Sequence, residues 1–564
     1  MKRKKTTNTK CCKVRQAEHV PEVFISQGTM SAPLKLPASI CRWLDNWGPE
    51  LRRHLQEALC SAAKLWPMLA DSCPSRSSDS SFFNCVDLRV GTDCSGVESP
   101  LHALQALGIP FQHEFSSESA PAPRKVIAAN TRPKIFMEDV HCQDKDLPHV
   151  DLYVSGFSCK PFSMLHWKTE LLEEAEAQIF FSVLQRIRAN RPAAYVLENV
   201  EGISRCMGKI LPMLEDVGYQ VSVLSLNPTE LGEPINRPRI YFVGVRSDVA
   251  KLSKEASQLF YKHIWSHLTQ KCLHRNKCEF GSNLTPLWHR LLPDDSDLVA
   301  AKRKERMLKW KEAKQLGFPD KRSTTKWRQR HQAWSAGREY KVPAEGNLQW
   351  AELSPDKLHL HLPRERDAWW SLSQPFDEPC KVVADLSQNL DRMPCRTDGS
   401  LPTITPGSHI MLGCAGRALL PVEKLLLHGL PLHRMILPDG ISDADLESMG
   451  GNMMHLQTVA VAMAVALSLV DWAHPHALLP TAVPAVPAAP AAQALAANLK
   501  NTKTRRNRKT AAEKRLEMKL KARFGFHQGK GRAKAKVPKA RTAVASKAKS
   551  RGGPSCLRGT RWHS

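Results

Sequence analysis

The sequence lacks the cysteine spacing of a structural zinc site. It contains 16 cysteines, yet no two stand in the CxxC pairs that zinc ribbons and zinc fingers use. An apolar segment of the kind that directs secretion is also missing after the basic start, Met1–Lys5. We therefore expect no metal ion, free thiols and a reducing intracellular compartment.

Long hydrophobic runs are missing as well. The longest apolar run, Val459–Val470, has about 12 residues, whereas a helix that crosses a bilayer needs about 20. The sequence therefore predicts no membrane partner, while its 42% hydrophobic content is enough for a sizeable core.

Acidic residues are scarce relative to basic ones, and the imbalance lies at the two ends. The 564 residues contain 81 Lys and Arg against 55 Asp and Glu, a formal net charge of +26. Residues 1–15 carry +7 and residues 500–564 carry +20, so residues 16–499 carry only −1. Basic flexible ends attract polyanions by releasing counterions, without reading base sequence.

We therefore expect the basic tail to contact a nucleic-acid backbone; a merely solvated tail is the alternative. Two short basic clusters, Lys2–Lys5 and Thr504–Lys509, predict a nuclear location if the protein is eukaryotic.

Strand and helix patterns alternate between residues 81 and 247. Strands are predicted at 84–90, 111–117, 134–137, 152–155, 194–197 and 240–245, and helices at 99–107, 122–130 and 172–189. Such alternation is typical of an α/β fold with a doubly wound, mostly parallel sheet.

The remaining patterns divide the chain into six segments. We predict a basic, disordered start (1–37), a helix with a polar linker (38–80), a catalytic core (81–247), a Trp-rich and basic insert (248–394), a second part of the core that ends in an apolar helix over 455–470 (395–472), and an Ala/Pro-rich, then basic, disordered tail (473–564).

One cysteine, Cys159, follows the fourth predicted strand within the sequence GFSCKPFS. α/β enzymes place reactive groups outside the carboxyl ends of their strands. The fifth strand ends at Glu198, and two arginines, Arg237 and Arg239, stand two apart at the start of a later strand and so face one side. This set combines a nucleophile, a carboxylic acid and two cations; a buried structural cysteine is the alternative.

Three successive strand ends carry groups suited to an adenosine-containing cofactor. The first strand runs into a small loop with Cys94, Ser95 and Gly96, whose backbone N–H groups are open to close approach. Glu118 follows the second strand and is suited to bind ribose hydroxyls. Asp139 and Val140 follow the third strand and are suited to bind the adenine amino group and to pack on its ring. The loop is not a full GxGxxG, so a dinucleotide site is disfavoured.

These motifs, in this order, resemble those of the cytosine-5 DNA methyltransferase family. Two late segments agree: Arg417–Pro431 resembles the family's Arg-x-Leu-x-Pro-x-Glu run, and Gly451–Met454 resembles the Gly-Asn turn that closes over the cofactor. The resemblance spans residues 84–470, with a long insert where the family keeps its target-recognition region.

The resemblance implies a class I methyltransferase (Rossmann-like) fold with an inserted, smaller target-recognition domain, at residues 248–394. Cys159 then corresponds to the nucleophile that adds to C6 of a cytosine flipped out of duplex DNA, and Glu198 to the acid that engages N3 and the exocyclic amine. Arg239 corresponds to the contact to O2, and Arg237 to a support of the cysteine loop. The implied cofactor is S-adenosyl-L-methionine, held by Cys94, Ser95, Gly96, Glu118, Asp139, Val140 and Asn452.

The sequence departs from the family's pattern around these groups. Ser158 and Lys160 flank the cysteine where the family has Pro and Gln, and Ile235 replaces a Gln. Glu98 and Ser99 stand where the family has glycines, which places an extra carboxylate near the methionine end of the cofactor, and Ser119 replaces an aromatic residue. Two alternatives therefore stay open: a catalytically weakened or inactive nucleic-acid-binding protein, and an RNA cytosine-5 methyltransferase, which usually carries a Cys-Phe-Thr signature that is absent here.

Overall fold

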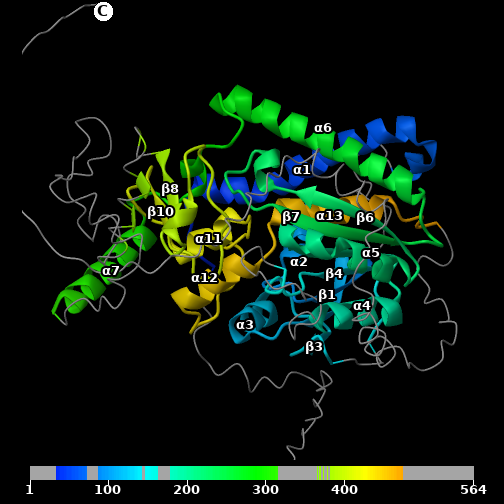
Figure 1. Ribbon diagram of the computed structural model, residues 1–564, viewed down its shortest axis with the longest axis horizontal. Helices are drawn as coiled ribbons and strands as arrows, with labels where there is room; N and C mark the ends of the chain where they lie inside the picture. The colour runs from blue at the N-terminus through cyan, green and yellow to red at the C-terminus, as the bar shows by residue number, and fades with distance from the viewer. Residues whose placement is uncertain are drawn as a thin grey trace, which may run out of the picture. The chain divides into compact units, whose positions relative to one another are not determined.

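A seven-stranded sheet forms the centre of the computed structural model (Figure 1). The structure describes residues 33–72, 87–142, 147–162, 178–315 and 381–473, with a few single residues between 365 and 378. The sheet order is β3-β2-β1-β4-β5-β7-β6. The strands are β1 (Leu88–Asp93), β2 (Phe111–Ser117), β3 (Ile135–Met137), β4 (Leu152–Ser155), β5 (Ala194–Val200), β6 (Tyr219–Leu226) and β7 (Arg239–Arg246).

The order of the strands reverses its winding direction between β1 and β4. Strands β3, β2, β1, β4 and β5 are parallel, whereas β7 runs antiparallel to both β5 and β6. From β1 the chain winds outward to β2 and β3, and then returns to β4 on the other side. Ligands of open α/β sheets bind where the winding direction reverses. The loops after β1 and β4 lie at this point.

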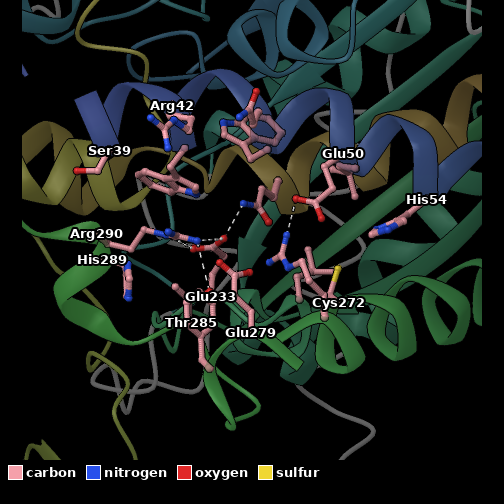
Figure 2. A pocket seen from close by; sticks show the side chains of 18 residues that line it. Ser39, Arg42, Glu50, His54, Glu233, Cys272, Glu279, Thr285, His289 and Arg290 are labelled. Atoms are coloured by element: carbon pink, nitrogen blue, oxygen red, sulfur yellow. Dashed lines mark hydrogen bonds and ion pairs between the residues drawn. The ribbon is translucent and has the colours of Figure 1, made fainter. Parts of the chain in front are cut away.

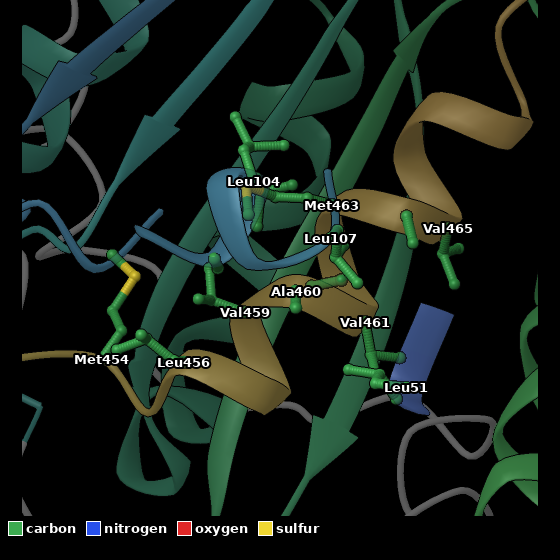
Figure 3. Packing of buried hydrophobic residues seen from close by; sticks show 14 of the residues in the cluster. Leu51, Leu104, Leu107, Met454, Leu456, Val459, Ala460, Val461, Met463 and Val465 are labelled. Atoms are coloured by element: carbon green, nitrogen blue, oxygen red, sulfur yellow. The ribbon is translucent and has the colours of Figure 1, made fainter. Parts of the chain in front are cut away.

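One face of the sheet is covered by α13 (Leu456–Ser468), and every residue of this helix is buried. A helix that is apolar all round must be surrounded by protein. α13 packs on β5 and β7, on α2 (Ser99–Ala106) and on α1 (Ala38–Leu65), and α1 in turn packs against α6 (Lys254–Phe280). In Figure 3, Leu104 and Leu107 lie on one side of α13, and Val461 faces Leu51 of α1.

The opposite face carries α4 (Gln178–Asn190) and α5 (Met207–Glu215), and α3 (Pro121–Asn130) follows β2. Phe180, Val183 and Ile187 of α4 pack in one cluster with sheet residues such as Tyr153 and Tyr195. The buried strands are rich in β-branched and aromatic residues, which suits a sheet covered on both faces.

A second, antiparallel sheet of four short strands lies later in the chain, in the order β11-β10-β8-β9. Arg417 of this sheet is fully buried and donates two hydrogen bonds of 2.8 Å to Glu423. The remaining elements are β8 (Val383–Asp385), β9 (Cys395–Arg396), β10 (Ile410–Leu412), β11 (Arg417–Ala418), α7 (Asp297–Gln315), α11 (Pro421–Leu427), α12 (Asp443–Asn452), and the 3₁₀ helices η2 (Pro67–Ser72), η4 (Glu201–Cys206), η5 (Pro228–Leu231), η6 (Leu287–Arg290) and η8 (Leu390–Arg392).

The predicted α/β fold with a doubly wound, mostly parallel sheet is confirmed. Strands 111–117 and 152–155 and the helix over 122–130 agree with β2, β4 and α3 within a residue. Several elements were missed, among them β6 and α6. β6 follows Gly218, whose φ of 91° marks the turn after α5. α6 lies in a segment that we expected to lose regular pattern, although Phe260, Ile264, Leu268 and Cys272 recur every four residues.

The six predicted segments stay a prediction. The start of the chain, part of the polar linker, most of residues 316–380 and the tail from residue 474 lie outside the described residues. No helix in the described ranges combines the length and the apolar character needed to cross a membrane.

Candidate active site

Aromatic packing fixes the loop that carries Cys159. Phe157 is buried and its ring lies 6.0 Å from that of Phe162 and 5.4 Å from that of Phe180 in α4. The Phe162 N–H donates to the Cys159 carbonyl at 3.0 Å, and Arg205 donates to the Phe162 carbonyl at 3.0 Å. The loop is therefore a closed turn, anchored on both sides of the half-buried thiol.

Asn199 connects this loop to the end of β5. Its buried side-chain amide donates to the Phe157 carbonyl at 3.0 Å, while its Oδ1 accepts from the Val200 N–H at 2.9 Å. We did not assign Asn199 a role from the sequence. Its place directly after Glu198 could have indicated a role. Successive side chains of a strand point to opposite sides, so Asn199 must face away from the side on which Glu198 lies.

Glu198 and Arg239 form an ion pair beside the thiol. Strands β5 and β7 are antiparallel with Val200 opposite Arg239, so the arginine side chain reaches the strand-end acid. Arg239 Nε lies 2.9 Å from Glu198 Oε1, and each side chain is 11% exposed. Burial of both partners makes the charge-assisted hydrogen bond stronger than it would be in water.

The surroundings of Cys159 oppose its ionisation. Burial raises the pKa of the thiol, and the Glu198 carboxylate raises it further, whereas Arg239 and Arg237 act in the opposite direction. Lys160 lies next to the thiol in sequence, but its side chain is exposed. The cations that favour the thiolate are therefore the two arginines that precede and begin β7.

Arg237 ties three parts of the chain together. Its guanidinium donates to the carbonyls of Ile404 at 2.8 Å, Gly451 at 2.9 Å and Met453 at 2.8 Å. Burial, followed by the charge of Arg239, lowers the pKa of Arg237 to about 9. These hydrogen bonds go to the chain before β10 and to the end of α12, and the support of the cysteine loop by Arg237 stays a prediction.

Gly156 marks the point where the predicted groups converge. A Cβ atom at this position would lie 2.7 Å from the Met454 Cε, 3.1 Å from the Cys94 carbonyl oxygen and 3.7 Å from Glu198 Oε2. The end of the Met454 side chain can move, but the Cys94 carbonyl belongs to the backbone, so little room is left for a side chain at this position. The cysteine loop, the loop after β1, the end of β5 and the chain after α12 therefore meet here.

The loop after β1 is tightly wound. Cys94 (φ 53°), Gly96 (φ 67°) and Glu98 (φ 61°) all adopt left-handed backbone angles. A Cβ atom on Gly96 would lie 3.7 Å from the Met453 Cα, so the Gly-Asn turn does lie against this loop. The side chain of Asn452 itself is exposed and donates to Ser448 Oγ at 3.4 Å.

Glu118 is held at the end of β2 by backbone N–H groups. Ala120 N–H donates to its carboxylate at 2.9 Å, and the N–H groups of Gly96 and Ser119 also donate to it. Burial raises the pKa of Glu118, while these hydrogen bonds lower it. Arg124 of α3 donates to the carbonyls of Glu118 and Met137 and so holds the ends of β2 and β3 together.

The end of β3 places Asp139 and Val140 at the same edge. Val140 is buried, and the Asp139 carboxylate accepts from the His141 N–H at 2.9 Å. All seven residues predicted for the cofactor therefore lie after β1, β2, β3 or α12, on loops that follow these elements or at the helix end.

Asp93 is a further buried acid that we did not single out from the sequence. It pairs with Arg186 of α4 at 3.1 Å and accepts from Ser117 Oγ at 2.5 Å and from the Tyr153 hydroxyl at 2.6 Å. Burial raises its pKa, and these partners oppose that rise. Asp93 thus joins β1, β2, β4 and α4 immediately before the loop after β1.

A cavity of about 400 Å³ lies elsewhere, between α1, α6 and the chain around η6 (Figure 2). Inside it, Arg290 donates to both carboxylate oxygens of Glu233 at 3.0 and 3.2 Å and lies 4.3 Å above the Trp43 ring. Gln457 of α13 donates to the same carboxylate at 3.0 Å. None of the predicted catalytic or cofactor residues lines this cavity.

The strand order, with one antiparallel strand between β5 and β6, defines a class I methyltransferase fold. Comparison with known proteins agrees. Residues 83–343 match the family of C-5 cytosine-specific DNA methylases. The match covers a little less than half of the chain.

Individual relatives share parts of the chain. The type II methyltransferase M.NgoBV of Neisseria gonorrhoeae is 35% identical over 156 residues, which are 25% of this chain and 37% of that protein. The DNA (cytosine-5-)-methyltransferase DMT5 of Cryptococcus neoformans var. grubii is 25% identical over 427 residues, which are 68% of this chain and 17% of that protein. The chain therefore spans at most 37% of the length of these two relatives.

Among solved structures, the Dnmt2 methyltransferase of S. pombe is 13% identical, with a TM-score of 0.38, over 68% of this chain and 98% of that one. The assignment of the fold is therefore based on the strand order and on the family match.

Proposed function

We propose that the protein transfers a methyl group from S-adenosyl-L-methionine to C5 of cytosine in DNA, through a covalent adduct between Cys159 and C6 of a flipped base. One observation carries the proposal: the Cys159 thiol lies with the Glu198–Arg239 ion pair at the carboxyl ends of β4 and β5, next to the loop after β1.

The loops at this edge fit the proposed cofactor. Ser95 Oγ is buried and has no hydrogen-bond partner among the described residues, and the carboxylates of Glu118 and Asp139 are acceptors beside the buried Val140. Cys94, Ser95, Gly96, Glu118, Asp139, Val140 and Asn452 would hold it. When bound, S-adenosylmethionine supplies an electrophilic methyl group for the base.

Cys159 starts the reaction as the thiolate. Its sulfur forms a bond to C6 of cytosine, which makes C5 nucleophilic, while Arg239 and Arg237 stabilise the thiolate against the effect of burial. Glu198 shares a proton with N3 and so accommodates the negative charge that the attack places on the ring. After C5 has gained the methyl group, loss of the C5 proton to a base and of the cysteine thiolate from C6 restores the aromatic ring.

The substrate would have to leave the DNA stack to reach this thiol. Cys159 lies in a closed turn in which Phe157 and Phe162 are buried, and a base within a duplex cannot approach it. Base flipping costs on the order of a few kcal/mol. Contacts of the basic tail with the DNA backbone would offset part of this free-energy cost. The same basic clusters support a nuclear location in a eukaryotic cell.

The direct test measures transfer of a tritiated methyl group to duplex DNA by the wild type, Cys159→Ala and the control Cys278→Ala. Cys278 is exposed on α6, far in sequence from the cysteine loop. We expect wild-type incorporation in the control and a loss on the order of 10³-fold or more in Cys159→Ala, because the proposed mechanism uses the Cys159 thiolate as its nucleophile. Incorporation that persists in Cys159→Ala would exclude Cys159 as the nucleophile.

Two further outcomes separate the alternatives. Binding of DNA without incorporation by the wild type would support a non-catalytic nucleic-acid-binding protein, and incorporation into RNA but not DNA would support an RNA methyltransferase. Bisulfite sequencing of a bacterial host that expresses the protein would then report the sequence context of the methylated cytosines.

A further inference from the structure

Glu98 occupies a backbone position that favours glycine. Its φ is 61°, in the left-handed region, and it directly precedes α2 as the N-cap residue. A side chain other than glycine is strained in this conformation, so it persists only where other contacts hold it. The contacts of the Glu98 side chain are therefore informative.

The carboxylate of Glu98 points into the protein, toward β1 and β2. It is fully buried, and its Oε1 accepts hydrogen bonds from Thr92 Oγ1 at 2.9 Å and from Ser116 Oγ at 2.5 Å. His113 Nε2 lies 3.8 Å from the same oxygen. The hydroxyls of β1 and β2 thus hold the carboxylate that the sequence places near the methionine end of the cofactor, and its nearness to the cofactor stays a prediction.

The other oxygen, Glu98 Oε2, is buried and has no hydrogen-bond partner among the described residues. An unpaired buried carboxylate oxygen is costly, and the cost is smaller when the group is held by short hydrogen bonds elsewhere. The two hydroxyl contacts therefore define where Glu98 sits, and they join the start of α2 to β1 and β2.

Glu98 also acts on Glu118 through its charge. Burial is the main cause that raises the pKa of Glu118, and the charge of Glu98 raises it further. The groups around Glu118 are the N–H donors of Gly96, Ser119 and Ala120, which lower its pKa, the thiol of Cys94, and Arg124, whose guanidinium binds the Glu118 carbonyl. Asp139, at the end of β3, lies close enough to act on Cys94 as Glu118 does.

We propose that Glu98 is a positioning residue for cofactor binding: the hydrogen bonds that it accepts from Thr92 and Ser116 anchor the loop between β1 and α2 to the sheet. Loss of its charge also shifts the pH dependence that Glu118 gives to cofactor affinity. The inference rests on the proposed function, since Glu118 is assigned there to the cofactor. Substitution with Gln keeps the shape and removes the charge, whereas substitution with Gly tolerates the backbone angle and removes the anchor.

The sign of the pH effect follows from like-charge repulsion. Glu118 accepts hydrogen bonds from ribose hydroxyls best when it is ionised, so affinity falls as the pH falls through its pKa. Removing the negative charge of Glu98 lowers the pKa of Glu118. The loss of affinity in Glu98→Gln must therefore begin at a lower pH than in the wild type.

The test is isothermal titration of the full-length protein with S-adenosylhomocysteine between pH 5.5 and pH 8.5. Wild type, Glu98→Gln, Glu98→Gly and the control Glu138→Gln are compared, and melting temperatures establish that each variant is folded. The Glu138→Gln substitution removes the same charge at the same edge of the sheet, but the Glu138 side chain is 85% exposed. The acidic limb of the affinity profile is the pH range over which cofactor affinity falls. We expect this limb to lie lower by about half a pH unit or more in Glu98→Gln than in the wild type, and to be unchanged in the control.

For Glu98→Gly we expect a Kd about tenfold higher at pH 7.5, with kcat at saturating S-adenosylmethionine within about threefold, because the anchor acts on the cofactor loop and not on Cys159. An unshifted acidic limb in Glu98→Gln, or wild-type Kd values in folded Glu98→Gly, would overturn this inference alone. A wild-type protein that binds no S-adenosylhomocysteine at any pH would overturn the proposed function, and this inference with it.

Discussion

The thiol of Cys159 is placed where its nucleophilic form is disfavoured before the substrate binds. Burial and Glu198 raise its pKa, whereas Arg239, Arg237 and a backbone hydrogen bond lower it. A flipped cytosine would offer its N3 and exocyclic amine to Glu198 and so relieve part of the repulsion between the Glu198 carboxylate and the Cys159 thiolate. The resting thiol is thereby kept from reacting with other electrophiles, while its position in the aromatic turn is already set.

The first prediction concerns the ionisation of this thiol. Alkylation of Cys159 by iodoacetamide, followed by mass spectrometry, will show a midpoint above the ordinary cysteine pKa of about 8.5. Arg239→Gln will move the midpoint higher, because it removes a cation next to the thiol and leaves Glu198 without its ion pair. A wild-type midpoint below that of free cysteine, or a downward shift in Arg239→Gln, would contradict the assignment.

At the scale of elements, buried ion pairs join segments that the sheet alone does not connect. Glu233 follows η5, Arg290 ends η6 and Gln457 belongs to α13, and their hydrogen bonds hold the three together beneath α1. Burial alone would raise the pKa of Glu233, but the charge and hydrogen bonds of Arg290, with His455 and Gln457, lower it to about 2. The pair is therefore ionised at neutral pH and depends on both members.

The second prediction compares Arg290→Met with Arg53→Met in chemical denaturation. Loss of Arg290 leaves the Glu233 carboxylate buried and uncompensated, and we expect the free energy of unfolding to fall by about 3–5 kcal/mol. Arg53 pairs with Glu57 on the surface of α1, with 59% of its side chain exposed, and its loss should cost under about 1 kcal/mol. Equal effects of the two substitutions would show that the buried pair is not a stabilising contact.

The same pair has a pH signature. The pKa of Glu233 is depressed in the folded state, so the stability that it contributes is present above its unfolded pKa of about 4.3 and is lost as the pH falls toward about 2. The difference in stability between wild type and Arg290→Met should therefore narrow below about pH 4.

At the scale of the whole molecule, the charge and the proposed chemistry lie in different parts of the chain. The site is built within residues 87–473, whereas the largest excess of positive charge lies in residues 500–564, outside the described residues. Electrostatic attraction to a polyanion needs no fixed geometry, but attack on one ring carbon does. The two tasks can therefore be separated by mutation.

The third prediction uses this separation. Deletion of residues 500–564 will weaken binding to a fluorescent duplex by about tenfold or more at low salt, and will lower the slope of log K against log salt by several units. Deletion of residues 477–499 removes chain but no Lys, Arg, Asp or Glu, and should leave the slope unchanged. If the slope of log K against log salt were equal in the wild type and in the deletion of residues 500–564, the contacts with the DNA backbone would have to come from residues 1–499.

Much of the fold and the candidate site could be predicted because their signals are local. The period of apolar residues and the turns between them specify β2, β4 and α3, and the acid or cysteine after each strand specifies its place at one edge of the sheet. Helix α6 carried a local signal too, but it was obscured by the charged residues on its exposed side.

The sequence by itself determined the α/β class, the order of the strand-end motifs and therefore the edge at which Cys159, Glu198 and Glu118 would gather. The tertiary structure alone decided which way Glu98 points, that Asn199 holds the cysteine loop, and that Arg237 binds Ile404, Gly451 and Met453. The reason is physical: periodicity reports which face of an element is buried, whereas hydrogen-bond partners such as Arg237 and Met453, 216 positions apart, meet only when packing brings their segments together.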